Sequence, residues 1–289
     1  MNNYRSVLVH VGGSERTSHV LTCAAILAAE QSASLHALHL EESLHLGAYL
    51  SPETAMFAAQ LRQDGERQRT SRARERVLEA AQVRGTPIDF QSPGGDPAEA
   101  LIARSRTADL VVIGQPSEDD PHGPSSRFAS QLLVRGGCPV LFVPGTEFAE
   151  GCGMRVLVAW SATRESARAL RDALPMLQRA TAVEVLSFGS TDFGSENPLD
   201  AVAAYLSAHG ISVTCSVKPV REVSFGERML TPSVVDASIA ELLLSSAADM
   251  DADLIVMGGY GHTRTYELVL GGVTRTMLGS MTVPVLMSH

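Results

Sequence analysis

Lysine is almost absent from this chain. Of 23 basic residues only Lys218 is a lysine, and 32 acidic residues give a formal net charge of −9. A P-loop kinase or a Schiff-base enzyme needs a lysine within a defined motif, whereas Lys218 precedes a proline outside any such motif. Neither half of the chain is basic, which argues against a broad nucleic-acid-binding surface.

Cysteine and long apolar runs are also scarce. The four cysteines are too far apart for a CxxC pair, which predicts reduced thiols rather than a disulfide framework. No apolar stretch reaches the roughly 20 residues that span a bilayer, and no basic region followed by an apolar run opens the chain. We therefore expect a cytoplasmic protein that does not bind membranes.

The most informative feature that is present is an internal repeat. The repeated segments are SVLVHVGGS (6–14) and RVLVAWSAT (155–163), ADLVVIGQP (108–116) and ADLIVMGGY (252–260), and CPVLFVP (138–144) and VPVLMSH (283–289). A glycine-containing stretch at 145–153 reads as a linker. The repeat predicts two similar domains, residues 1–145 and 153–289.

Short Val/Ile/Leu runs alternate with helical stretches in each copy. In the second copy we expect strands at 156–159, 183–188, 211–217, 254–257 and 283–287, and helices at 165–178, 200–208, 233–248 and 271–278. Uniformly apolar strands that alternate with helices indicate a parallel sheet covered on both faces. Ligands of such sheets bind beyond the carboxyl ends of the strands, here just after Ala159 and Met257.

A glycine-rich segment follows Met257. Gly258 and Gly261 are separated by two residues, nine more precede Gly271, and Gly271 and Gly272 open a helix. Backbone amides at a helix N-terminus bind phosphate, and glycine permits the close approach that this requires. The same glycines could serve only to turn the chain, and their spacing alone does not decide between the two.

The repeat, the domain size and the spacing G-x-x-G-x9-G resemble the universal stress protein family in its tandem two-domain form. The most specific segment is GGYGHTRTYELVLGGVTRTML (258–278), followed by VPVL. The resemblance implies that each domain is a five-stranded parallel sheet with helices on both faces, an adenine-nucleotide-hydrolase-like and Rossmann-like α/β fold. It also implies that the second domain binds ATP, or the related AMP or ADP, with or without Mg²⁺, and that the bound state alters assembly or contact with unidentified protein partners during stress.

The resemblance assigns the nucleotide to three parts of the second copy. They are the end of its first strand, the end of its second strand, and the glycine loop with the following helix: Ala159, Trp160 and Ser161; Phe188; and Met257, Gly258, Gly261, His262, Gly271, Gly272, Val273 and Thr274. Trp160 could shield a base or pack between the domains. His262 could donate to a phosphate or stay solvated.

Two positions depart from the pattern of the family's ATP-binding members. Gly272 stands where a Ser or Thr follows the last loop glycine, and Ser161 stands where an Asp would contact the ribose and adenine. We therefore expect binding through backbone amides to be weaker. The same departures favour an alternative, a nucleotide-free interaction module on the same scaffold.

The first copy departs further. Gly12 occupies the Asp position, Ser117 replaces the second loop glycine, and three acidic residues at 118–120 place negative charge where a polyphosphate would sit. We predict that this half binds no nucleotide and serves the pairing of the domains. Alternatively, its loop at 119–126 closes over another surface.

Catalytic and metal-binding constellations are missing from the sequence. There is no GxSxG motif, and no carboxylate is found beside the glycine loop where a nucleotidyl transferase or ATP pyrophosphatase would hold magnesium. His36 and His39 are an odd number of residues apart and therefore face opposite sides of a strand. We expect a binding protein with at most slow ATP hydrolysis, whose domains pair within the chain or form a homodimer through edge strands at 141–144 and 286–288.

Overall fold

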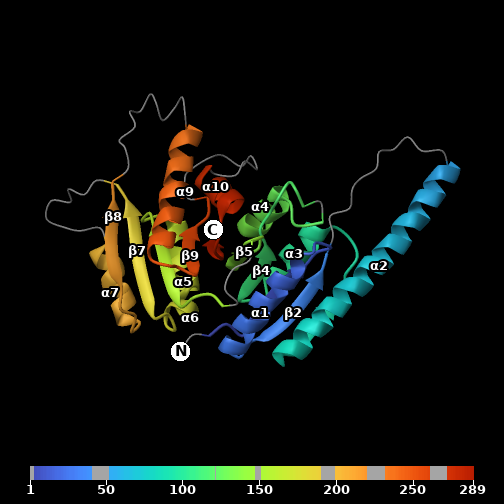
Figure 1. Ribbon diagram of the computed structural model, residues 1–289, viewed down its shortest axis with the longest axis horizontal. Coiled ribbons are helices and arrows are strands. Elements are labelled where there is room, and N and C mark those ends of the chain that lie inside the picture. Colours follow the sequence, from blue (N-terminus) through green and yellow to red (C-terminus); the bar gives the residue numbers. More distant parts are fainter. Residues whose placement is uncertain are drawn as a thin grey trace.

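Ten strands form a single sheet in the computed structural model, which describes residues 3–40, 52–120, 122–146, 151–189, 199–219, 232–260 and 272–289 (Figure 1). The strand order is β3-β2-β1-β4-β5-β10-β9-β6-β7-β8. The first half contributes β1 (Ser6–Val11), β2 (Ser34–His39), β3 (Ile88–Gln91), β4 (Leu110–Gly114) and β5 (Val140–Val143). The second half contributes β6 (Arg155–Trp160), β7 (Ala182–Phe188), β8 (Thr214–Lys218), β9 (Leu254–Gly258) and β10 (Val285–Ser288).

Helices cover both faces of this sheet. One face packs against α1 (Thr17–Gln31), α2 (Pro52–Arg84), α5 (Arg164–Asp172), α6 (Leu174–Leu177) and α7 (Asp200–Ala208). The other face packs against α3 (Pro97–Ser105), α4 (Ser126–Arg135), α9 (Pro232–Asp249) and α10 (Gly272–Ser280). Because successive strand residues point to opposite faces, Val7 and Val9 join the first core cluster and Leu8 the second. The predicted fold class is confirmed.

The predicted elements of the second copy are all present, with small differences at their ends. The helix expected at 165–178 is divided into α5 and α6, with Ala173 between them. Pro175 explains the break, because proline has no amide hydrogen to donate and its ring clashes with the carbonyl four residues earlier. The strand expected from residue 211 begins at Thr214.

The two halves are joined in the sheet by β5 and β10. These strands pair antiparallel, with Leu141 opposite Leu286 and Phe142 opposite Val285, whereas the other adjacent strands pair parallel. They are the strands that the sequence suggested as edges. The domains therefore pair within the chain, and the sheet is continuous across them.

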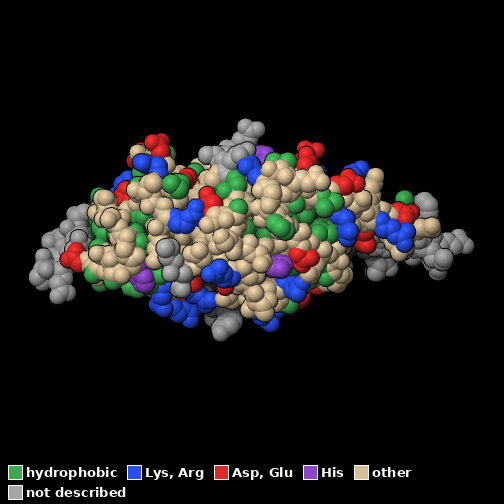
Figure 2. Space-filling model, turned by 90° about the horizontal axis from the view of Figure 1, so that it is seen from below, with side chains coloured by type: hydrophobic (Ala, Val, Ile, Leu, Met, Phe, Trp, Pro, Cys, Tyr) green, Lys and Arg blue, Asp and Glu red, His purple; other side chains and the backbone are tan. Residues whose placement is uncertain are grey.

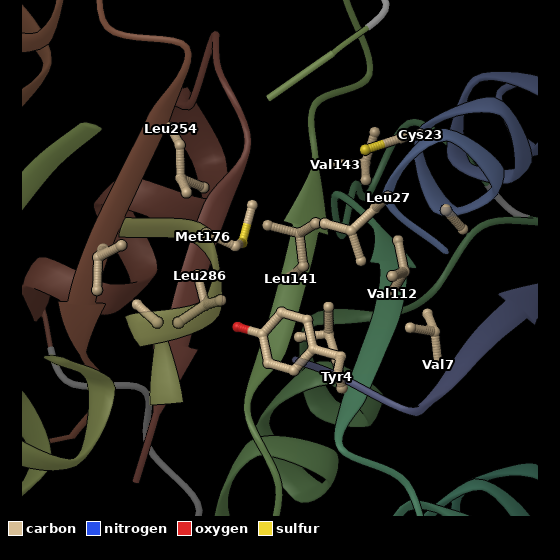
Figure 3. Packing of buried hydrophobic residues seen from close by; sticks show 14 of the residues in the cluster. Tyr4, Val7, Cys23, Leu27, Val112, Leu141, Val143, Met176, Leu254 and Leu286 are labelled. Atoms are coloured by element: carbon tan, nitrogen blue, oxygen red, sulfur yellow. The ribbon is translucent and has the colours of Figure 1, made fainter. Parts of the chain in front are cut away.

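A shared apolar core supports this junction. Figure 3 shows Tyr4, Leu27 and Leu141 of the first half facing Met176 and Leu286 of the second. All five side chains are buried and belong to one cluster that extends across both halves. Burial of this apolar surface is the main driving force for the association of the halves.

Polar contacts also cross the junction. The Tyr4 hydroxyl donates to the backbone carbonyl of Asp172 at 2.6 Å, and Gln31 Nε2 donates to the carbonyl of Pro175 at 3.2 Å. Ser288 Oγ donates to the Asp172 carboxylate at 2.8 Å, which anchors β10 to α5. Burial raises the pKa of Asp172 although the Ser288 and Arg168 side chains act in the opposite direction.

The surface carries charges of both signs. Lys and Arg side chains lie interspersed with Asp and Glu over the described part of the face shown in Figure 2. In the part of the chain that the structure describes, neither α2, α9 nor any other helix combines the length and apolarity of a membrane span.

We predict that Tyr4→Phe lowers the free energy of unfolding by about 1–2 kcal/mol, because the partly buried Asp172 carbonyl loses its donor. Chemical denaturation of the full chain measures this change. Tyr205→Phe on α7 is the control, since that ring lies against His209, at a centroid distance of 4.7 Å, rather than at the junction. Equal stability of Tyr4→Phe and the unmutated protein would contradict the role given to this hydroxyl.

Candidate functional site

The carboxyl ends of β6, β7 and β9 meet at one edge of the second half. The parallel register places Ala159 beside Met257 and Trp160 beside Ser187, with Phe188 one residue further along β7. Met257 is buried, whereas Ala159, Trp160 and Phe188 are partly exposed and Ser161 is exposed. The strand-end residues that the sequence singled out therefore lie together.

The rings of Trp160 and Phe188 pack on opposite faces of the sheet. Trp160 packs against the cluster that includes α5, α6 and α7, whereas Phe188 packs against the cluster that includes α9 and α10. A ligand on the α10 side could therefore meet the Phe188 side chain but only the backbone of Trp160. The Trp160 ring belongs to the core of the opposite face, and whether it shields a base stays a prediction.

Ser161 is presented by a tight turn at the end of β6. Ala162 has φ 54°, in the left-handed region, and Thr163 then caps α5 by accepting a hydrogen bond from the Ser166 amide at 3.3 Å. Ser166 Oγ accepts from the Thr163 amide at 3.0 Å, which completes a capping box. The Ser161 hydroxyl lies 3.2 Å from that of Thr163 and remains exposed at the edge.

Gly258 has a packing role that its spacing in the sequence did not reveal. A Cβ atom at this position would lie 2.6 Å from the Ser166 nitrogen and 2.7 Å from the Glu165 carbonyl carbon. Both are backbone atoms of the first turn of α5 and cannot move aside cheaply. Only glycine lets β9 and α5 approach this closely, so Gly258 shapes the edge whether or not a ligand is present.

Glu165 is a neighbour that the sequence analysis missed. Its Cβ would lie 2.9 Å from a Cβ on Gly258. The expectation that no acidic magnesium ligand lies beside the glycine loop is not tested by this contact. Burial opposes ionisation, but hydrogen bonds from its own amide and from Arg164 leave the pKa of Glu165 below its usual value. The carboxylate is committed to Arg164 at 3.0 Å and to the N-terminus of α5. The capping motif Thr163-x-x-Ser166 could have indicated this position.

The start of the glycine segment contacts both its own half and the first half. The Gly259 amide donates to the Ser288 carbonyl at 2.9 Å, and a Cβ at Gly259 would lie 2.6 Å from Leu133 Cδ2 on α4. The Tyr260 amide donates to Thr274 Oγ1 at 3.4 Å, and Tyr260 has φ 60°. These contacts link β9, α10 and α4 at a single point.

Helix α10 begins at the same edge. Its first turn contains Gly272, Val273 and the buried Thr274 and carries no acidic residue. The positive end of a helix dipole without a neighbouring carboxylate in its first turn is suited to an anion. Gly261, His262 and Gly271 lie outside the described residues, so their assignment to the loop stays a prediction.

The corresponding edge of the first half is filled by the protein's own loop. Ser14 Oγ donates to the Asp120 carboxylate, whose other oxygen accepts from the His122 amide at 3.2 Å. The His122 carbonyl would lie only 2.8 Å from a Cβ on Gly12. The remaining cavity of about 20 Å³ has room for about one water molecule. The loop therefore closes over the end of its own first strand.

His10 lines this cavity and is buried beneath the loop. Its Nε2 lies 3.1 Å from the Leu40 carbonyl, and its ring centroid is 5.2 Å from that of Phe128. Burial lowers the pKa of His10 to about 4, so the ring is neutral at physiological pH. The described residues contain no group of three His, Cys, Asp or Glu side chains placed to hold a metal ion.

The duplicated α/β architecture and its two strand-end loops agree with a comparison against protein families. The model of the universal stress protein family matches residues 3–144 and, a second time, residues 154–289. The chain belongs to the universal stress protein family. It is a tandem member, in which each half matches the family separately.

Solved structures share the arrangement of this tandem universal stress protein. A universal stress protein from Archaeoglobus fulgidus is 16% identical with a TM-score of 0.68, and the similarity covers 97% of this chain and 95% of that one. A protein of unknown function from Pseudomonas aeruginosa is 18% identical with a TM-score of 0.56, covering 98% and 92%. At these identities the likeness establishes the fold alone.

A universal stress protein solved in complex with cAMP is 20% identical to this chain, with a TM-score of 0.35. The similarity covers 50% of this chain and all of that one. The ligand belongs to that protein. A comparison with curated protein sequences gave no match to this universal stress protein.

We predict that Gly258→Ala lowers the free energy of unfolding by about 2–3 kcal/mol, because the added methyl group meets the backbone of α5. Thermal or chemical denaturation without ligand measures the loss. Gly279→Ala on α10 is the matched control. Its Cβ would meet nothing within 4 Å, so its stability should be unchanged or higher by up to about 1 kcal/mol. Similar effects of the two substitutions would refute the packing role of Gly258.

We predict that His10 weakens the fold in acid. Because its folded-state pKa of about 4 lies below the usual histidine value of 6.5, the unfolded chain binds the proton first, and stability falls as the pH drops from 6.5 toward 4. Between pH 6.5 and 4.5 this group should cost about 2–3 kcal/mol. Urea titrations at both pH values should show that loss reduced in His10→Gln but not in His36→Gln, whose imidazole is partly exposed.

Proposed function

We propose that the second half of this universal stress protein binds an adenine nucleotide and acts as a binding or regulatory protein in the stress response. The observation that supports this most is the difference between the two strand-end edges. In the first half Asp120 and the His122 carbonyl fill the edge, whereas in the second half Ser161 is exposed and Ala159 and Phe188 are partly exposed. The resemblance to ATP-binding members assigns the ligand to this second edge.

The phosphate end of the proposed site would use backbone groups. The first turn of α10 supplies amides and a helix dipole without a carboxylate, and Gly258 leaves the end of β9 free of a side chain. Thr274 accepts the Tyr260 amide and so fixes where the segment leaves β9. Amides that already point outward bind an anion without reorganisation, which is why helix N-termini recur in phosphate sites.

The base and ribose end would use Phe188 and Ser161. Phe188 lies on the α10 side of the sheet, and Ser161 carries the exposed hydroxyl at the end of β6. A hydroxyl is a weaker partner for ribose hydroxyls than a carboxylate is. We therefore propose modest affinity for ATP, ADP or AMP.

We propose no magnesium ligand among the described residues. The Cβ atom of Glu165 lies beside Gly258, but its carboxylate forms an ion pair with Arg164 at 3.0 Å. We assign no catalytic residue, and we derive no hydrolytic step.

The proposed site also offers a route to partner contact. Gly259 and Tyr260, which follow the last strand residue of the site, contact α4 and α10 at the junction of the halves. A nucleotide that repositions this segment would therefore act on the surface where the two halves meet. This is the part of the proposal that concerns assembly.

Isothermal titration of the full chain with ATP, with and without magnesium, tests the proposal. We expect weak binding to one site per chain, and we expect Ser161→Asp to tighten it about tenfold by adding a charged acceptor for the ribose. Ser161→Asn, similar in size but neutral, is the matched control. The gain should vanish with 2′,3′-dideoxy-ATP, which lacks both hydroxyls. Absence of heat with millimolar ATP, ADP, AMP and cAMP for all variants would reject nucleotide binding.

A nucleotide-free interaction module is the second candidate, and the serine at position 161 favours it. Native mass spectrometry of the purified protein separates the two. A co-purified adenine nucleotide supports the site, whereas a bare chain together with silent titrations supports the module.

A further inference from the structure

One side chain of the first half is hydrogen bonded to the last helix of the second. Gln115 directly follows β4, and its Nε2 donates to the Leu278 carbonyl on α10 at 2.7 Å. Its Oε1 accepts from the Gly145 amide, shortly after β5, at 2.8 Å. Its own amide donates to the Val143 carbonyl at 2.7 Å. Gln115 therefore ties the ends of β4 and β5 to α10.

The two partners of this side chain determine its orientation. The Gly145 amide can only donate and the Leu278 carbonyl can only accept, so exchanging Oε1 and Nε2 would lose both hydrogen bonds. Both partners are backbone groups. The contact therefore fixes the main chain of α10 relative to the main chain of the first half.

The Leu278 carbonyl belongs to the last turn of α10, which ends at Ser280. The last four carbonyls of a helix have no amide partner within the helix. Since Leu278 is a buried residue, Gln115 supplies a partner that water supplies at an exposed helix end. The helix has nine residues and is about 13 Å long, so a shift at its last turn also moves its first turn.

The contact has no equivalent in the opposite direction. Within the repeated segments 108–116 and 252–260, Gly259 occupies the position that Gln115 has in the first copy. Gly259 has no side chain, and a Cβ there would lie 2.6 Å from Leu133 Cδ2 on α4. At this pair of positions the first half holds α10 by a hydrogen bond, whereas the second half packs against α4.

Gln115 also lines the cavity at the filled edge of the first half. Ser14 and Asp120, which are hydrogen bonded to each other, line the same cavity. The loop that covers this edge therefore begins at the residue that holds the last turn of α10. The first turn of α10 carries the amides that the proposed anion site would use.

We propose that Gln115 is a positioning residue through which the first half regulates anion binding at the first turn of α10. This inference rests on the proposed nucleotide site of the second half. The Gln115–Leu278 hydrogen bond holds the amides of 272–274 in place before a ligand arrives, so that binding costs less ordering of the chain. Without this hydrogen bond α10 shifts more freely, and the affinity for the anion falls.

Two substitutions separate this role from a purely local one. Gln115→Met keeps the length of the side chain and loses both hydrogen bonds. Gln115→Glu keeps an acceptor for the Gly145 amide, but at pH 8 it has no donor for Leu278. A role within the first half alone predicts that Gln115→Glu resembles the unmutated protein. Positioning of α10 predicts that both variants behave alike.

Gln178→Met is the matched control. Its Nε2 also donates to a backbone carbonyl, that of His209 at 3.3 Å, but this contact lies within the second half and away from α10. Loss of the hydrogen bond of Gln178 should leave α10 unchanged.

The first readout uses the full chain without ligand. Hydrogen–deuterium exchange of the α10 amides should become about fivefold faster in both Gln115 variants and stay unchanged in Gln178→Met. The amides of β6 are the internal reference and should exchange as in the unmutated protein. Unchanged exchange of α10 in either Gln115 variant would overturn the positioning role, whether or not the chain binds nucleotide.

The second readout is calorimetric titration of the same proteins with ATP. We expect the dissociation constant to rise by about threefold to tenfold in both Gln115 variants and to stay the same in Gln178→Met. Faster exchange of α10 with an unchanged dissociation constant would overturn the regulation of the site. Absence of binding by every protein, including the unmutated chain, would reject the nucleotide site and this regulation with it. The exchange data would still decide whether Gln115 positions α10.

Discussion

The antiparallel pairing of β5 with β10 is the interaction on which the rest of the structure depends. Each half alone would leave an apolar strand at the edge of its sheet, an arrangement that invites association. Pairing Leu141 with Leu286 covers both edges at once and extends one core across the molecule. Since the strands on either side of this pair are parallel within their own halves, the two sets of carboxyl ends point to opposite edges of the sheet.

This geometry allows the two copies to differ in their strand-end loops while sharing one scaffold. In the first half a loop carboxylate, Asp120, accepts a hydrogen bond from Ser14 at the strand ends, whereas among the described residues of the second half Ser161 is exposed there. In the second half Gly259 rests on Leu133, so the loop that would hold a ligand begins on the surface of its neighbour. The first half thus supports the start of this segment in the second half.

Local patterns in the sequence predicted much of this fold. The repeated Val/Ile/Leu runs located the strands because nearly all residues of a strand buried on both faces are apolar. The division between α5 and α6 could also have been anticipated from Pro175. Parallel order and the location of the strand ends followed from the alternation of strands and helices.

Contacts between distant segments could not be predicted in the same way. The close approach of Gly258 to α5 and the position of Glu165 each depend on how two elements pack, which no local pattern encodes. The prediction that the acidic loop of the first half is unsuited to phosphate stays a prediction. That this loop covers the end of its own first strand could be recognised only from the structure, which places the His122 carbonyl against Gly12.

Hydrogen–deuterium exchange of the full chain, with and without ATP, tests the central claim most directly, namely that one continuous sheet carries one open edge and one filled edge. The account predicts that the amides of β5 and β10 exchange only with global unfolding. It also predicts that ATP slows exchange at 159–161, 258–260 and 272–274 and leaves 12–14 and 115–125 unchanged. Fast exchange at β5 and β10, or equal protection of both edges by ATP, would contradict it.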